Sequence, residues 1–263
     1  MTSASIQLKK IVGMVSADPL RVFEMLDRYI KTGEGGAITF VNPGSVREAT
    51  MNAAYCEDLQ SHDLVYADGI LLAKFASWYR NENILRTSFD GNSLAPPVFE
   101  YCSNNNLKVY LVGARQGIAL KASEVIRLHF GVRIIGTYTG HINDSDRLAL
   151  MNSLVKLSPD LLVIAMGVPQ QERFAVELRE LGWKGVSISC GGYLDQIVSG
   201  GVQYYPEWIN RYNLRAFYRL VREPRRLGRR YFLHYSTFYF AILVAAAKRS
   251  TEFLYKFISA RSK

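Results

Sequence analysis

The sequence predicts an open, doubly wound α/β fold, in which helices cover both faces of a parallel sheet, followed by a basic helical appendage. Three observations predict it. Short runs rich in β-branched and aromatic residues alternate with longer stretches of helical periodicity. Runs such as Leu161–Met166 are apolar throughout, as in strands buried on both sides. The excess of positive charge is confined to the C-terminal part of the chain.

The strands and helices alternate in order along the body of the chain. The expected strands are Ala37–Asn42, Leu64–Ala67, Lys108–Val112, Val132–Thr137, Leu161–Met166 and Val186–Cys190. Helical periodicity is found near residues 18–31, 45–59, 69–80, 92–104, 116–129, 145–157 and 169–181. The body is expected to end near Ser199, before Gly200 and Gly201, which divides the chain into residues 1–199 and an appendage of residues 200–263.

The charge is distributed unevenly between these two parts. Residues 211–263 hold 13 Lys+Arg against two acids, Glu223 and Glu252, whereas residues 1–210 hold 19 basic and 21 acidic residues. The formal net charge of +9 therefore belongs to the appendage. Because Tyr, Phe and Leu are interleaved with the arginines, the pattern favours an anionic membrane surface over nucleic acid as the partner.

Residues 231–247 form the most apolar stretch of the appendage. The stretch is 17 residues long and is interrupted by His234, Ser236 and Thr237, whereas a spanning helix needs roughly 20 mainly apolar residues. An interfacial or shallowly inserted helix is expected, with arginines near lipid phosphates and aromatic rings at headgroup depth. The plainer alternative is a terminal helix packed on the body.

Cysteine, histidine and the N-terminus restrict the class of protein further. Cys56, Cys102 and Cys190 are widely spaced, which is typical of reduced thiols in the cytosol. The four histidines show no metal-ligand spacing, so we expect no metal and no cofactor. The first ten residues lack the apolar run of a secretion signal, so export is not expected.

Polar and glycine residues follow the predicted strands, where ligands bind in such sheets. Glycines allow a close approach of the backbone, and the helices behind them offer N–H groups to a phosphate. Neither a dinucleotide fingerprint nor a P-loop occurs, so a nucleotide ligand other than NAD(P) or ATP is favoured. The residues at these ends include Asn42, Asp68, Gly113, Gly167, Gln171, Gly191 and Gly192.

Asp68 is the sharpest catalytic candidate. It follows a strand and precedes Gly69, so its carboxylate can face a substrate as a general base; capping of the next helix is an equally good interpretation. Asn42 can hydrogen-bond a substrate hydroxyl or serve the turn before Pro43. Gln171 can contact a base or sugar, although a solvated residue of the first helical turn is the plainer alternative.

Arginines recur along one predicted helix face of the appendage. Arg211, Arg215, Arg219 and Arg222 are spaced by four and three residues, and Pro224 ends the pattern. A guanidinium group binds two oxygens of a pyrophosphate at once, although a solvated or lipid-facing basic surface explains many of these arginines equally well.

Four ordered motifs resemble the WecG/TagA/CpsF family of bacterial glycosyltransferases (glycosyltransferase family 26), and the resemblance extends from about Ala37 to Tyr231. The motifs are Tyr66–Ile70 (YADGI), Val163–Glu172 (VIAMGVPQQE), Cys190–Gly192 (CGG) and Phe217–Arg230 (FYRLVREPRRLGRR).

The resemblance implies a Rossmann-like catalytic body with a basic appendage that docks on the membrane and completes the active site. The implied reaction is inverting, metal-independent transfer of a hexose from a UDP-sugar to a polyprenyl-pyrophosphate-linked sugar, at the cytoplasmic face of the plasma membrane, in surface polysaccharide biosynthesis. Asp68 matches the general base of the family. The matching substrate-site residues are Asn42, Gln171, Gly191, Gly192, Arg219, Arg226 and Arg229.

Two departures bear on specificity. Phe40 stands where the family often has Thr, with Thr39 one place off, and the usual Arg-x-x-Gly-x-Asp-Leu stretch is replaced by Arg86–Leu94 (RTSFDGNSL). Arg86 and Asp90 are therefore further candidates for the site. This variant is more similar to the exopolysaccharide branch of xanthan-type GumM glucosyltransferases, which implies UDP-glucose and glucosyl-pyrophosphoryl-undecaprenol. UDP-N-acetylmannosamine, or its uronate, with a GlcNAc-lipid is the alternative.

Two other classes compete with an enzyme. A non-catalytic membrane adaptor that binds nucleotide sugars is consistent with the altered Arg86–Leu94 stretch. A nucleic-acid-binding protein is consistent with the basic appendage alone, but the apolar residues 231–247 argue against it. Formation of a homo-oligomer is left open.

Overall fold

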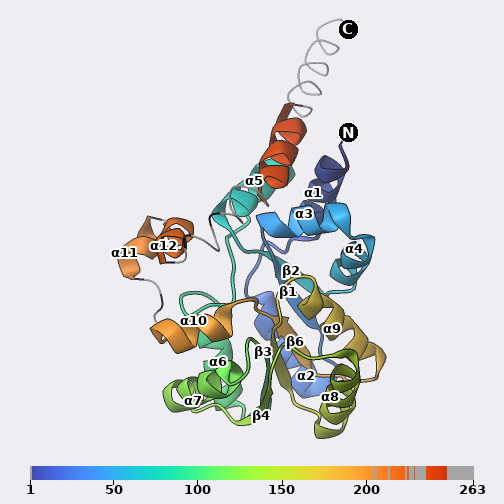
Figure 1. The fold of residues 1–263 in the computed structure, drawn as a ribbon, viewed down its shortest axis with the longest axis vertical. Coiled ribbons are helices and arrows are strands. Elements are labelled where there is room, and N and C mark those ends of the chain that lie inside the picture. The colour runs from blue at the N-terminus through green and yellow to red at the C-terminus, as the bar shows by residue number, and fades with distance from the viewer. Residues whose placement is uncertain are drawn as a thin grey trace, which may run out of the picture.

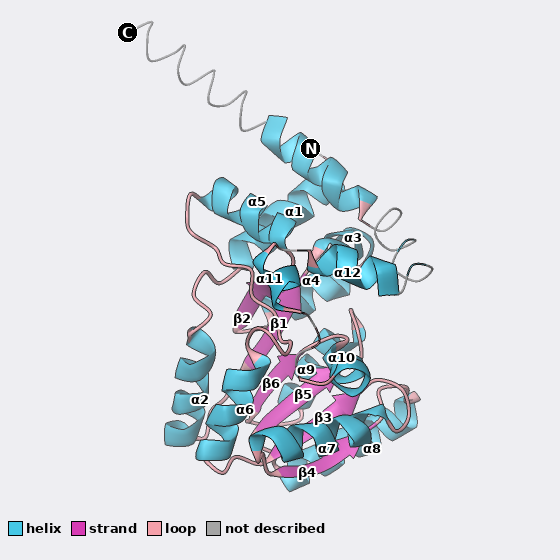
Figure 2. Cartoon of the chain, turned by 90° about the vertical axis from the view of Figure 1, so that its left-hand side faces the viewer, coloured by secondary structure: helices cyan, strands magenta, loops and turns pink. Residues whose placement is uncertain are grey.

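A computed structural model describes residues 2–202, 204, 206–212, 214–222, 224, 228 and 235–247; of residues 207, 210, 216, 219 and 222 it describes the backbone alone. The fold is an α/β Rossmann-like sandwich with helices on both faces of one six-stranded sheet (Figures 1 and 2). All strand pairs are parallel, in the order β2-β1-β6-β5-β3-β4. The carboxyl ends of all strands therefore meet at one edge.

The strands lie within two residues of their predicted bounds, because continuous apolar runs mark them in the sequence. β1, β3 and β5 are buried along their whole length, whereas β4 is a half-exposed edge strand. The strands are β1 (Ala37–Val41), β2 (Leu64–Ala67), β3 (Val109–Gly113), β4 (Ile134–Tyr138), β5 (Leu161–Ala165) and β6 (Val186–Ser189).

The helices of the body include three features that the periodicity does not predict. α1 precedes the first expected helix, α10 follows the last, and Asn52 divides the expected helix at 45–59 into two by capping the second. The helices are α1 (Ser3–Met14), α2 (Arg21–Thr32), α3 (Pro43–Met51), α4 (Ala53–Gln60), α5 (Ile70–Arg80), α6 (Ala95–Asn104), α7 (Ile118–Phe130), α8 (Asp144–Leu157), α9 (Gln170–Glu180) and α10 (Tyr193–Gly200).

Side chains that alternate along the strands divide the core between the two faces. Ile38 and Phe40 of β1 pack with α2, α6, α7 and α10 on one face. Ala37 and Val41, which point the other way, belong to clusters formed with α8 and α9 and with α1, α3, α4 and α5. Burial on both faces makes the strands mainly apolar, although Thr39 of β1 and Ser187 of β6 are buried polar residues within them.

The appendage contributes α11 (Glu207–Arg211), α12 (Arg215–Arg222) and a helix of residues 236–247. This last helix, red in Figure 1, lies beside α1 and α5. Its residues Phe238, Ala241 and Ala245 are buried in the same cluster as Leu8 of α1, whereas Leu243 is exposed. One face of this helix therefore packs on the body, as the plainer alternative expected. Residues 231–234 of the apolar stretch lie outside the described part of the chain.

We expect Phe238→Ala to lower the free energy of unfolding by about 3–5 kcal/mol, because its ring is fully buried and the cavity would collapse only in part. Thermal or urea denaturation in detergent measures the loss. Leu243→Ala on the exposed face is the matched control. Equal effects of the two substitutions would contradict the packing described here.

Candidate active site

The candidate site lies at the carboxyl edge of the sheet, where the order of the strands brings the sequence-predicted residues together. Asp68 follows β2, Asn42 follows β1, and Cys190–Gly192 follow β6. Since β1 pairs with β2 on one side and β6 on the other, Asn42 lies between the other two. Gly167 follows β5, the next strand in the sheet.

Asp68 does not cap the helix behind it. The N-cap of α5 is Gly69, whose φ of +136° favours glycine, and no side chain bonds this helix end. The Asp68 carboxylate instead lies 3.4 Å from Nη2 of Arg86 and is 38% exposed, open to a substrate. The structure therefore excludes the helix-capping interpretation of Asp68, whereas its role as a general base stays a prediction.

Arg86 joins Asp68 to a second carboxylate. Its Nη2 donates to Ser88 Oγ at 2.9 Å and to Asp90 Oδ2 at 3.3 Å, as well as to Asp68. Asp90 also accepts a hydrogen bond from Nη1 of Arg215, at 2.8 Å. Arg86 therefore lies beside both the candidate base and Asp90, and Arg215, which the sequence named only as one arginine of a helix face, joins this group through Asp90.

Asn42 forms a capping box at the start of α3. Its Oδ1 accepts from the N–H of Gly44 at 2.8 Å, and its own N–H donates to Ser45 Oγ at 3.0 Å. This is the turn role given as the plainer alternative. It fixes the backbone of Asn42 at the edge and, among the described residues, the side-chain NH₂ makes no hydrogen bond.

Gln171 joins two glycine turns from below the edge. The side chain is 2% exposed, and its Oε1 accepts from the N–H groups of Gly167 at 3.2 Å and Gly191 at 3.1 Å. Gly191 adopts a φ of +60°, and Gly192 begins α10. Gln171 is therefore buried and connects the ends of β5 and β6 through hydrogen bonds; it is not the solvated residue of the plainer alternative.

Glu172 extends this polar network into the core. Its Oε1 accepts from Thr39 Oγ1 at 2.8 Å and from Gln171 Nε2 at 2.9 Å. Its Oε2 has no hydrogen-bond partner among the described residues, nor has the buried hydroxyl of Tyr55. Burial raises the pKa of Glu172 to about 7, since desolvation opposes the charged form more strongly than the two hydrogen bonds favour it. The sequence singled out neither Thr39 nor Glu172 as site residues.

The described part of the chain holds no group of three or more His, Cys, Asp or Glu side chains arranged to bind a metal ion. Arg226 and Arg229 lie outside the described residues, and the side chain of Arg219 is likewise not described. Among the described residues, Arg86 and Arg215 are the guanidinium groups bonded to Asp68 and Asp90, and they could stabilise negative charge there.

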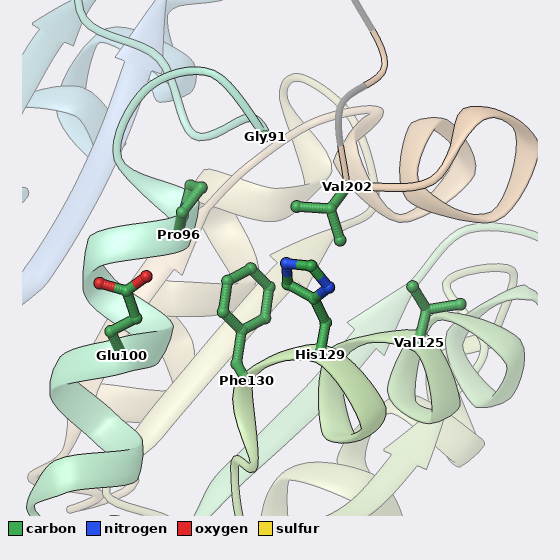
Figure 3. A pocket seen from close by; sticks show the side chains of 7 residues that line it. All are labelled: Gly91, Pro96, Glu100, Val125, His129, Phe130 and Val202. Atoms are coloured by element: carbon green, nitrogen blue, oxygen red, sulfur yellow. The ribbon is translucent and has the colours of Figure 1, made fainter.

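A pocket of about 570 Å³ is lined in part by Gly91, which belongs to the loop that carries Arg86 and Asp90; Asp68 is not among its lining residues. Figure 3 shows Gly91 and Val202 at its rim, with His129 and Phe130 of α7 below them. The remaining lining residues are Pro96, Glu100 and Val125. The loop thus has one side toward the candidate base and the other toward this pocket.

Comparison with known proteins places this geometry in a family. Residues 11–252 match the Glycosyl transferase WecG/TagA/CpsF family. The chain belongs to this family. It is a glycosyltransferase, and the resemblance carried by the four sequence motifs is confirmed.

Two relatives of the glycosyltransferase give a finer comparison. It is 32% identical to a UDP-Gal:alpha-D-GlcNAc-diphosphoundecaprenol beta-1,4-galactosyltransferase of Shigella boydii, over 77% of this chain and 84% of the relative. It is 29% identical to an N-acetylglucosaminyldiphosphoundecaprenol N-acetyl-beta-D-mannosaminyltransferase of Bacillus subtilis (strain 168), over 76% of this chain and 77% of the relative.

We expect Glu172→Gln to change how stability depends on pH. A carboxyl group with a pKa of about 7 when folded and about 4.3 when unfolded binds more protons in the folded state between these values. Its contribution to stability is full below about pH 4.3 and is lost as pH rises through about 7, a change of about 4 kcal/mol. Glu172→Gln should remove this dependence.

Urea denaturation at intervals between about pH 5 and pH 8 measures how the free energy of unfolding changes with pH, that is, the slope of stability against pH. Glu180→Gln, an exposed carboxylate on the same helix, is the control and should keep the wild-type slope. A slope in Glu172→Gln equal to that of the wild type would show that another group titrates.

Proposed function

We propose that the glycosyltransferase moves a hexose from a UDP-sugar to N-acetylglucosaminyl-diphosphoundecaprenol, with inversion and without a metal ion. The observation that carries the proposal is the Asp68 carboxylate, partly exposed beside Arg86 at the edge where the ends of β1 and β6 also lie. Both named relatives use a GlcNAc-diphosphoundecaprenol acceptor, which favours this lipid over the glucosyl lipid expected from the sequence.

Galactose is the favoured donor sugar, because the relative with 32% identity is named for transfer from UDP-Gal. The sequence-based hypothesis of UDP-glucose with a glucosyl lipid, and the alternative of N-acetylmannosamine or its uronate, stay as predictions. A transfer assay with this panel of UDP-sugars and both lipid acceptors separates them. A lipid-linked disaccharide from one pair identifies the reaction, whereas UDP binding without transfer by any pair supports the adaptor alternative.

In the proposed mechanism Asp68 accepts the proton of the acceptor hydroxyl as that oxygen attacks the anomeric carbon. The bond to UDP breaks as the new glycosidic bond forms, so a single in-line displacement inverts the configuration. Negative charge then develops on the leaving diphosphate. Arginine side chains of the appendage, Arg219, Arg226 and Arg229, would stabilise that charge, or the pyrophosphate of the lipid acceptor.

We further propose that residues 1–199 form the catalytic body and that residues 200–263 dock on the anionic cytoplasmic surface of the plasma membrane. The net positive charge of the appendage supports this, as do its exposed apolar side chains. Those on α11, α12 and the segment between them are Trp208, Tyr212, Leu214, Phe217 and Val221, each at least 38% exposed. None of the helices in the described part of the chain is long and apolar enough to cross a bilayer.

Asp68→Asn should lower kcat by about 10²–10⁴-fold, because the amide cannot accept the proton of the acceptor. UDP affinity should stay near the wild-type value, which isothermal titration measures. Asp144→Asn, an exposed aspartate at the start of α8, is the matched control. Turnover by Asp68→Asn at the wild-type rate would remove Asp68 from the mechanism.

Arg226→Ala should lower kcat by roughly 10²-fold, on the scale of losing one donor to a developing oxyanion, while EDTA leaves turnover unchanged. Arg133→Ala, an exposed arginine just before β4 at the opposite edge of the sheet, is the control. Inhibition by EDTA that Mg²⁺ or Mn²⁺ reverses would show that a metal supplies the stabilisation.

A further inference from the structure

We propose that Asp90 is a positioning residue that fastens the start of the arginine-rich appendage to the loop next to the candidate base, through a shared ion pair with Arg86 and Arg215. The inference rests on the proposed function, because it gives the appendage a place in the site. It concerns a contact within the chain, however, that can be measured without any sugar transfer.

The Asp90 carboxylate is saturated with hydrogen bonds. Oδ1 accepts from the N–H of Asn92 at 2.9 Å, and Oδ2 accepts from Ser88 Oγ at 2.7 Å, in addition to the two guanidinium groups. The side chain is 9% exposed, against 19% for Arg86 and 14% for Arg215. An exposed ion pair contributes little to folding stability. At this depth the charges are shielded from water and oriented by the surrounding hydrogen bonds, so breaking the pair costs more.

The signs of charge alternate along the row Asp68, Arg86, Asp90 and Arg215. Asp90 separates two guanidinium groups that share its Oδ2. Neutralising this carboxylate would remove the negative charge that lies between the two guanidinium groups, so their mutual repulsion would grow and the hold on the start of α12 would weaken. The same change would leave Arg86 with Asp68 as its remaining carboxylate in this row, so that Arg86 would be held less firmly.

A second contact holds the same loop to the entrance of the appendage. A Cβ added to Gly91 would lie 1.8 Å from the carbonyl oxygen of Val202, so only glycine permits this approach. Figure 3 shows both residues at one rim of the pocket. The loop thus contacts the chain just after α10 and again at Arg215 of α12, and Arg219 follows one helical turn later.

The Asp90–Arg215 pair therefore determines where the arginine-rich segment begins relative to Asp68. A functional role in positioning differs from a merely structural one in its measurable consequences. Loss of a local bond would change stability alone. Loss of a positioning bond would also release residues 208–217 to a protease and lower kcat, with a smaller effect on KM.

The experiment is a double-mutant cycle of Asp90→Asn and Arg215→Gln in the full chain, with Arg211→Gln as the control because Arg211 is exposed on α11. Limited digestion with chymotrypsin measures cleavage after the exposed Trp208, Tyr212 and Phe217. We expect each single variant to be cleaved about tenfold faster than wild type, and the double variant no faster than either. Arg211→Gln should be cleaved at the wild-type rate.

Transfer kinetics provide the second readout. Each single variant should lose about tenfold or more in kcat, again without a further loss in the double variant. Because Arg215→Gln leaves the internal bonds of the loop in place, it keeps the test valid if Asp90→Asn misfolds. Independent, multiplying effects would overturn the proposal, as would cleavage at the wild-type rate. Faster cleavage with unchanged kcat would overturn the positioning role.

Failure of the proposed function has a different signature. If the protein transfers no sugar, but both single variants are cleaved faster and the double variant no faster still, the Asp90–Arg215 contact is supported and the proposed transfer reaction is not. If the protein transfers sugar, but neither substitution changes cleavage or kcat, the transfer reaction is supported and the positioning role of Asp90 is not.

Discussion

Parallel pairing of six strands is the constraint on which the rest of this structure depends. Parallel neighbours require a crossover, and the crossover helices cover both faces of the sheet, so the central strands must be apolar along their length. Polar side chains are thereby concentrated beyond the carboxyl ends. Among the buried polar side chains, Thr39, Gln171 and Glu172 are bonded in a row next to that same edge.

The two halves of the chain differ in how charge is handled. The body is close to neutral, and two of its buried carboxylates pair with arginines: Asp58 with Arg173, and Asp90 with Arg86 and Arg215. The appendage holds an excess of arginine over acid that its own sequence cannot neutralise. Its counter-charges must be supplied from outside the appendage, by the body at Asp90 and, under the proposed function, by diphosphate groups and lipid headgroups.

The sequence predicted the strands and the edge on which the site lies because both depend on local pattern. Apolar runs define β1 to β6, and Asp68 and the glycines follow directly from where these runs end. It did not predict the pairing of Arg215 with Asp90, because the two residues are 125 positions apart and only the fold brings them together. For the same reason the sequence could not decide between the alternative roles of Asp68 and Gln171. Contacts with Arg86 orient Asp68, and the N–H groups of Gly167 and Gly191 orient Gln171.

The helix of residues 236–247 has a consequence for the synthesis of the protein. Its buried stripe belongs to the cluster that Leu8 of α1 also helps to form. α1 is translated before the sheet and this helix after it, so the cluster stays incomplete until residues 236–247 have been translated. A nascent chain that stalls before residue 236 therefore presents an apolar face of the body that this helix would cover.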